Sequence, residues 1–139
     1  MFRSANSWML LTELDSGEIN NVSLSIPGNP CFPLKIKTNI SRPVAVSYDP
    51  LEGKIYWADS SLKLVARAYP DGSSTDVVAY GNVGNPRGLA IDYTGRSLYW
   101  CDFGTNKIEV ARLDGSFRTT LINSSIERPM AIILDIAGR

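Results

Sequence analysis

The feature that most constrains this chain is a stretch that occurs twice, 43 residues apart. The motif Tyr-Trp-x-Asp stands at 56–59 and again at 99–102. A repeat of roughly 40–45 residues with short apolar runs and turn residues is typical of the blades of a β-propeller or a similar array. Residues around the motif keep the same spacing, namely Pro43, Pro86 and Pro129, and Asp49, Asp92 and Asp135.

Each repeat contains four short candidate strands separated by turn residues. The run 43–48 is nearly continuously apolar, as expected of an innermost strand that is buried on both faces. Ile, Tyr and Trp in 54–58 favour a pleated, half-buried surface, and Asp-Gly at 71–72 favours a hairpin turn. No ten-residue window has a helical period, so we predict an all-β chain. The expected strands are 43–48, 54–58, 62–69 and 73–79 in the first repeat, and 86–92, 97–101, 107–113 and 117–122 in the second.

The two ends of the chain fit the repeat as parts of further units. Leu10 to Glu13 falls where Tyr-Trp-x-Asp would stand, which predicts a divergent unit that starts at its second strand. The C-terminal residues repeat a first strand and its turn. The predicted organisation is a lead at 1–7, a divergent partial blade at 8–41, whole blades at 42–84 and 85–127, and the first strand of a further blade at 128–139.

The composition leaves little material for catalysis or for nucleic-acid binding. Fourteen Lys and Arg balance fourteen Asp and Glu, and histidine is absent. The commonest general base and metal ligand is therefore missing, and no hydrolase or phosphate-loop motif is present. Asp49, Asp92 and Asp135 end the innermost strands, where we expect them to accept backbone N–H groups in turns rather than to form a pair of catalytic carboxylates.

Cysteine spacing and glycosylation motifs bear on the cellular compartment. Cys31 and Cys101 fit no zinc or redox spacing, and we expect two unpaired, mostly buried thiols. No apolar run of about 18 residues is present that would span a membrane. Sequons at Asn21, Asn39 and Asn123 argue weakly for secretion, in which case the signal peptide lies outside this chain.

The chain resembles LDL-receptor class B (YWTD) repeats, most strongly over 42–139. The resemblance rests on the Tyr-Trp-x-Asp motif, on the strand that begins at each repeated proline, and on the Ala-Arg-Leu-Asp-Gly-Ser hairpin at 111–116. The resemblance implies a six-bladed propeller in an extracellular receptor or matrix protein, usually followed by an EGF-like module. In that family the motif is structural, with aspartates that tie blades by hydrogen bonds and aromatic rings that pack between blades. Ala58 and Cys101 depart from it, because the family prefers Thr there. The structural set here is Tyr56, Trp57, Asp59, Tyr99, Trp100 and Asp102.

Only about half of a six-bladed ring is present in the sequence. Two explanations stay open: the chain is a piece of a longer protein that holds the rest of the ring, or a second copy supplies the missing half. The second is attractive because the first unit lacks a first strand and the C-terminus supplies one. A homodimer of this kind predicts twice the mass of the chain in solution.

The candidate binding surface lies at one end of the blades. Because strands alternate in direction, the starts of the innermost strands and the turns after the second strands share that end. The resemblance to LDL-receptor-related Wnt co-receptors implies ligand binding there. Arginines on it suit carboxylates, although they could instead bridge neighbouring blades or be solvated, and an exposed Phe103 suits an aromatic anchor. Glycans at Asn39 and Asn123 would restrict access. The candidates are Arg42, Ser60, Leu62, Arg87, Phe103, Thr105 and Arg128.

Three functions remain at this stage. The first is a non-catalytic, extracellular module that binds a protein ligand in an LDL-receptor-like receptor, with endocytosis or Wnt-type signalling as its context and no cofactor. The second is a structural propeller of the nidogen type that grips a laminin-type partner. The third is a propeller enzyme of the lactonase or esterase type, which needs acids or histidines around a central metal.

Overall fold

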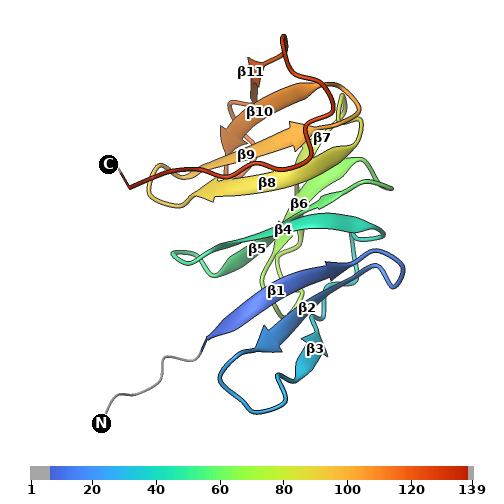
Figure 1. Ribbon diagram of the computed structural model, residues 1–139, viewed down its shortest axis with the longest axis vertical. Helices are drawn as coiled ribbons and strands as arrows, with labels where there is room; N and C mark the ends of the chain where they lie inside the picture. The colour runs from blue at the N-terminus through green and yellow to red at the C-terminus, as the bar shows by residue number, and fades with distance from the viewer. Residues whose placement is uncertain (1–6, 138–139) are drawn as a thin grey trace.

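The computed structural model describes residues 7–137, which form three antiparallel sheets stacked in a row (Figure 1). Sheet 1 has three strands, in the order β1-β2-β3, and sheets 2 and 3 have four each, in the orders β4-β5-β6-β7 and β8-β9-β10-β11. The predicted all-β class and the four-stranded repeats are confirmed. The strands are β1 (Trp8–Glu13), β2 (Glu18–Ser23), β3 (Cys31–Pro33), β4 (Pro43–Asp49), β5 (Lys54–Asp59), β6 (Leu64–Ala68), β7 (Asp76–Tyr80), β8 (Pro86–Asp92), β9 (Ser97–Asp102), β10 (Lys107–Arg112) and β11 (Thr119–Ile122).

Strand direction shows which strand of a blade each element represents. In Figure 1 the β8 arrow runs to the left, whereas β1 and β9 run to the right. Glu13 pairs with Glu18 across the β1–β2 turn, as Asp59 pairs with Leu64 across the β5–β6 turn. β1 therefore occupies the second-strand position, and Glu13 stands where the other sheets have the motif aspartate. The division of the chain into blades with the predicted bounds stays a prediction.

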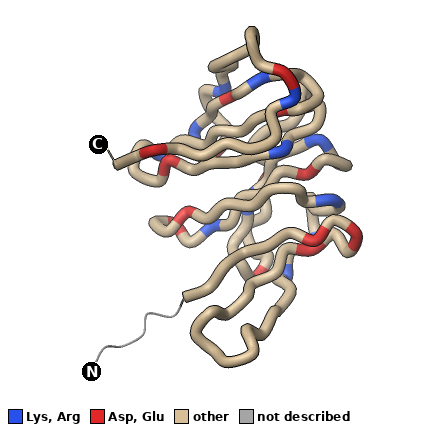
Figure 2. Tube along the Cα trace, viewed as in Figure 1, with Lys and Arg blue, Asp and Glu red and all other residues tan. Residues whose placement is uncertain are grey.

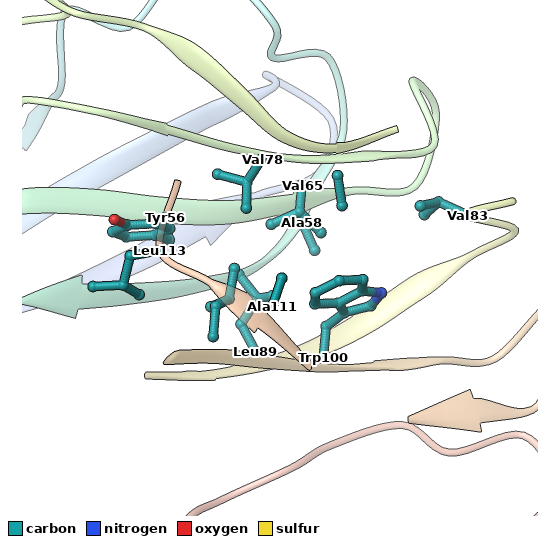
Figure 3. Close-up of a cluster of buried hydrophobic side chains, with 11 residues drawn as sticks. Tyr56, Ala58, Val65, Val78, Val83, Leu89, Trp100, Ala111 and Leu113 are labelled. Carbon is teal, nitrogen blue, oxygen red and sulfur yellow. The ribbon is translucent and has the colours of Figure 1, made fainter. Parts of the chain in front are cut away.

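Apolar side chains fill the two spaces between the sheets. One cluster joins sheets 2 and 3 and contains Tyr56, Leu89 and Trp100 (Figure 3). A second cluster joins sheets 1 and 2 and contains Ile19 and Trp57. Both tryptophans of the repeated motif are fully buried. Side chains of the second strands thus fill the spaces between sheets, although Tyr99 of the motif is half-buried and belongs to neither cluster.

The outermost strands begin later than the repeat pattern predicts. β7 starts at Asp76 and β11 at Thr119, where strands from 73 and 117 were expected. Ser74 and Phe117 have positive φ angles of 51° and 54°, a left-handed conformation that a strand cannot continue through. Asp71 also accepts hydrogen bonds from the backbone N–H and hydroxyl of Ser73, which extends the turn.

The C-terminal segment lies against β8 without forming a sheet. A Cβ atom added to Gly88 would lie 2.9 Å from the Cα of Ala131, so the two backbones are in direct contact, and Figure 1 shows the segment running beside β8. No strand is assigned within 123–137. The first strand expected at 128–139 therefore stays a prediction, and its last two residues, like 1–6 of the expected lead, fall outside the described residues.

A bidentate ion pair ties sheets 2 and 3 at the end where the innermost strands finish. The two terminal nitrogens of Arg96 donate to the two carboxylate oxygens of Asp49 at 2.8 and 2.7 Å. Burial raises the pKa of Asp49, but the hydrogen bonds and charge of Arg96 and backbone N–H donors outweigh it and leave the pKa below its usual value. Elsewhere, charged residues of both signs are spread over the three sheets (Figure 2).

Candidate ligand-binding site

The strand-start end is the end of the sheets where β4 and β8 begin and where the β5–β6 and β9–β10 turns lie. In sheet 2 it is organised by Asp59, which is fully buried. One carboxylate oxygen accepts the backbone N–H groups of Ser41 and Arg42 at 2.7 and 2.8 Å, and the other accepts those of Ser61 and Leu62 at 3.0 and 2.8 Å. The carboxylate thus fixes both the segment that leads into β4 and the turn after β5.

Asp102 repeats this arrangement in sheet 3. It accepts the backbone N–H groups of Gly84, Asn85, Gly104 and Thr105 at 2.7–3.0 Å. Because four donors already occupy each carboxylate, both aspartates serve the scaffold rather than a metal ion. Their effect is to hold the loops of the strand-start end in place, and the role of tying blades together stays a prediction.

The most distinctive group at this end is a stack of two guanidinium groups on one aromatic ring. The guanidinium carbon of Arg87 lies 5.5 Å from the centre of the Phe103 ring, and that of Arg128 lies 5.6 Å from it. Phe103 is half-buried rather than exposed, so the prediction of an exposed ring is wrong: the two arginines cover it. The backbone N–H of Arg128 also donates to the Asn106 side chain at 2.7 Å. The pairing joins successive repeats at the surface.

Three polar side-chain atoms beside this stack are buried and have no hydrogen-bond partner among the described residues. They are Oδ1 of Asn85, Nε of Arg87 and Oγ1 of Thr105. Buried polar atoms in folded proteins nearly always have a partner, either protein or water. The group therefore marks a position where an outside polar group, supplied by water or by a ligand, improves the hydrogen bonding.

The other predicted site residues lie at the same end but on sheet 2. Arg42 and Leu62 are exposed. The Ser60 hydroxyl lies 3.4 Å from the backbone carbonyl oxygen of Arg42. Ser60 occupies the position that Phe103 has in sheet 3, so no stack forms in sheet 2. The structure thus brings Arg87, Phe103, Thr105 and Arg128 into one group and leaves the sheet 2 residues as its neighbours.

Sequence reasoning missed Asn85 and Asn106 at this site. Asn85 precedes the repeated proline in sheet 3, whereas the other two repeats have arginine there. That single departure from the repeat was the available signal. Asn106 has a φ of 55° in the turn before β10, a conformation that Asn tolerates better than most residues.

The cysteines and sequons are placed as follows. Cys101 is buried and unpaired, as predicted, and burial raises the pKa of its thiol. Cys31 is also unpaired but exposed on β3, so the expectation of a buried thiol is wrong there: sheet 1 leaves this strand uncovered. Asn39 lies before β4 and Asn123 after β11, both in loops, whereas Asn21 lies in the central strand of sheet 1. Glycan attachment at these three stays a prediction.

The chain resembles known proteins in sequence. The family description of the low-density lipoprotein receptor repeat class B matches residues 53–93 and 96–136, which together make up more than half of the chain. Low-density lipoprotein receptor-related protein 4 of Mus musculus is 41% identical over 65 residues, 46% of this chain and 3% of that protein. Low-density lipoprotein receptor-related protein 5 of Homo sapiens is 38% identical over 61 residues, 44% of this chain and 4% of that protein. The chain therefore spans only a small part of these relatives.

Solved structures extend the likeness to nearly the whole fold. A chain in a crystal structure of a nidogen/laminin complex matches 94% of this chain with a TM-score of 0.84 and 24% identity, and this chain covers 50% of it. A virginiamycin B lyase from Staphylococcus aureus matches 91% of this chain with a TM-score of 0.66 and 16% identity, and this chain covers 42% of it. The described residues contain no helix long and apolar enough to cross a membrane. With the repeat, the motif and the sheet order all in agreement, the chain belongs to the family of low-density lipoprotein receptor class B repeats and is a partial β-propeller of the YWTD type.

Proposed function

We propose that this chain is a non-catalytic, extracellular module that binds a protein ligand at the strand-start end. The observation that carries the proposal is the stack of Arg87 and Arg128 on Phe103, next to buried polar atoms without partners. Arginine and aromatic residues are over-represented among the residues that dominate binding energies at protein interfaces.

The chemistry of the stack favours an acidic or carbonyl-rich segment of the ligand. A guanidinium group that lies over a ring keeps its N–H edge available, and that edge matches a carboxylate with two parallel hydrogen bonds. Stacking also limits the rotamers of both arginines, so less conformational entropy is lost on binding. The side chain of Arg42 extends the positive charge onto sheet 2.

A displayed random-peptide library panned on the full chain tests the proposal. We expect the enriched peptides to carry carboxylates, and their binding to fall at least about tenfold with Arg87→Glu or Phe103→Ala, since about 1.4 kcal/mol corresponds to a factor of ten. The matched controls are Arg112→Glu and Phe117→Ala, because Arg112 lies 4.8 Å over the Phe117 ring in the sheet 3 hairpin, at the opposite end. Equal losses in both pairs would contradict a site at the strand-start end.

Thermal unfolding of the same variants separates binding from a bridging role. If Arg87→Glu lowered the unfolding temperature and left peptide binding intact, the two arginines would serve to join the blades, and the site would be rejected. Binding lost at an unchanged unfolding temperature supports the proposal.

The biological setting is part of the same proposal. We place the chain in the ectodomain of an LDL-receptor-like receptor, where endocytosis or Wnt-type signalling would follow ligand binding and an EGF-like module would follow the propeller. The alternative partner is a laminin-type matrix protein, because a nidogen in complex with laminin has this fold. Purified laminin is therefore the second probe in the binding assay, and binding to it that depends on Phe103 would favour the matrix role.

A further inference from the structure

The three sequons look alike in the sequence but lie in different places on the sheets. Asn21 stands in the middle of β2, whereas Asn39 and Asn123 stand in loops. An N-linked glycan is bulky and hydrophilic, so a folded chain accommodates it only where the asparagine side chain reaches solvent. The structure therefore separates sequons that can carry a glycan from those that cannot.

Asn123 has an open position at the outer rim of sheet 3. It follows directly after β11, the outermost strand of that sheet. Because β10 begins at the strand-start end and β11 runs antiparallel to it, Asn123 lies at that end. Asn123, Ser124 and Ser125, which make up the sequon, are all exposed.

The exposure of Asn123 is independent of whether a further blade follows sheet 3. The position 43 residues earlier is Tyr80, which ends β7 in sheet 2 and has sheet 3 packed beside that sheet. Tyr80 is nevertheless 78% exposed. Gly81 and Asn82, which correspond to Ser124 and Ser125, are exposed as well. This place on a blade thus faces solvent even when the next blade is present.

Asn21 has the opposite environment. It is half-buried in the central strand of sheet 1, where it pairs with Leu10 on β1 and Phe32 on β3. Because side chains alternate along a strand, Asn21 points to the same face as Ile19, which packs with Trp57 between sheets 1 and 2. A glycan at Asn21 would lie where these two sheets meet, so a chain that carried it could not close sheet 1 on sheet 2.

We propose that Asn123 carries an N-linked glycan in the folded protein and that Asn21 carries none. The donor is an oligosaccharide linked to a lipid diphosphate. A bond forms between its anomeric carbon and Nδ2 of Asn123, and the bond from that carbon to the diphosphate oxygen breaks. The lipid diphosphate leaves, and Nδ2 gives up one proton to the transferase. This transfer takes place in the secretory pathway, so the proposal rests on the extracellular placement in the proposed function.

A glycan at Asn123 also limits where a protein ligand can bind. Arg87 and Phe103 come from β8 and from the turn after β9, the two inner strands of sheet 3, whereas Asn123 follows the outermost strand. The glycan keeps the outer rim of sheet 3 in solvent. A ligand at the strand-start end therefore contacts the inner strands and leaves the loop after β11 uncovered.

Site occupancy tests the proposal directly. The full chain is secreted from mammalian cells behind an added signal peptide, and its glycans are released with peptide N-glycosidase in water labelled with heavy oxygen. The release leaves a labelled aspartate at each occupied position. We expect mass spectrometry to find the label at 123 in most secreted chains and to find none at 21. An unlabelled 123 or a labelled 21 would overturn the proposal.

The two serines of the sequon give a matched pair of variants. Ser125→Ala removes the sequon without altering Asn123 and should abolish the label at 123, whereas Ser124→Ala keeps the sequon and should preserve the label. Tyr80→Asn combined with Asn82→Ser transfers the sequon to the corresponding loop of sheet 2. We expect a label at 80 as well, and its absence would contradict the solvent-facing position on which the proposal depends.

Peptide binding separates this proposal from the proposed function. The carboxylate peptides enriched on the chain should bind equally well before and after glycan release, and stronger binding after release would contradict the inner-strand placement of the ligand. An occupied Asn123 in a chain that binds no peptide would reject the ligand site and leave the glycan standing. Peptide binding by a secreted chain that is unmodified at Asn123 would have the reverse meaning.

Discussion

Trp57 and Trp100 occupy the same position in consecutive sheets, and both are fully buried, but the chain ties them down in different ways. The Trp57 indole N–H donates to the backbone carbonyl of Asn39 at 2.8 Å, while that of Trp100 has no partner among the described residues. Over the Trp100 ring lies the guanidinium of Arg118, 5.4 Å from its centre. Arg118 also donates to the backbone carbonyls of Tyr80 and Gly81 at 3.2 and 2.8 Å.

The difference shows which part of the repeat is fixed and which part varies. The indole ring is needed to fill the space between sheets, so it is the same in both repeats. The link from that ring to the loop of the preceding sheet is made by a direct hydrogen bond in one repeat and by an arginine in the other. The same buried indole ring is thus compatible with two different polar links to the preceding loop.

Removing either ring should have the largest effect. Trp57→Ala and Trp100→Ala should each lower the free energy of unfolding by about 3–5 kcal/mol, because a large cavity remains in a fully buried position. Urea denaturation measures the loss, with the exposed Tyr80→Ala as the control that should be near neutral. A loss below about 1 kcal/mol at either position would mean that the sheets do not depend on the ring.

Removing the arginine should distinguish the two repeats next. Arg118 pairs with Glu109 through two nitrogens at 3.0 and 2.9 Å, and the Glu109 side chain is only 7% exposed. Arg118→Leu leaves that carboxylate buried without its partner, so we expect a loss of about 3 kcal/mol or more in urea denaturation.

The matched change is Arg67→Leu in sheet 2. Arg67 pairs with Asp76, whose side chain is 51% exposed, so the carboxylate left behind is solvated and the ion pair itself contributes only about 0–1 kcal/mol. A larger loss for Arg67→Leu than for Arg118→Leu would contradict this account of the two sheets.

Replacing each indole by phenyl tests the hydrogen bond directly. Trp57→Phe leaves the Asn39 carbonyl without its donor, whereas Trp100→Phe removes an N–H that has no partner. We expect Trp57→Phe to cost about 1 kcal/mol more than Trp100→Phe in urea denaturation. Equal costs would show that the N–H of Trp100 is satisfied in solution, for example by water.

Acid should weaken the joint between sheets 2 and 3. The pKa of Asp49 lies below its unfolded value of 3.8, so the unfolded chain takes up the proton first. The stability contributed by this carboxylate is complete above pH 3.8 and is lost as the pH falls through the folded pKa. The urea midpoint of the unaltered chain should therefore fall with acid more steeply than that of Arg96→Gln. Parallel curves would show that Arg96 does not set this pKa.

The fold could be predicted from the sequence because the 43-residue repeat marks the strands and turns of each sheet. The spacing of Tyr-Trp-x-Asp predicted the two four-stranded sheets, and Asp49 and Asp92 accept backbone N–H groups of Leu51 and Gly95 in the turns after the innermost strands. Sequence reasoning missed the Asp49–Arg96 pair because those residues are 47 apart, a spacing that the 43-residue period does not mark. The turns at Ser74 and Phe117 were missed because serine and phenylalanine rarely adopt positive φ, so nothing in their identity predicts it.

The candidate site was reached only in part. The alternation of strand direction identified the strand-start end, since it depends on topology alone. It could not show that Phe103 is covered by two arginines, because that depends on side-chain rotamers and on Ser60 standing at the equivalent position in sheet 2. The residues that differ between the two repeats indicate the candidate site, whereas the residues that are identical in both repeats belong to the scaffold.

The hairpin glycines have a consequence for how the sheets are spaced. A Cβ atom added to Gly72 would collide with the backbone carbonyl of Lys35 in the segment after β3, and one added to Gly115 would collide with that of Val78 in β7. The two glycines have φ angles of +85° and +89°. Each hairpin therefore touches its neighbour main chain to main chain, with no side chain between them. Because main chain meets main chain, the contact fixes the distance between neighbouring blades. Core residues can then change in size from one repeat to the next while the angle between blades stays constant. An array of blades needs that constancy, because small errors in each step add up along it.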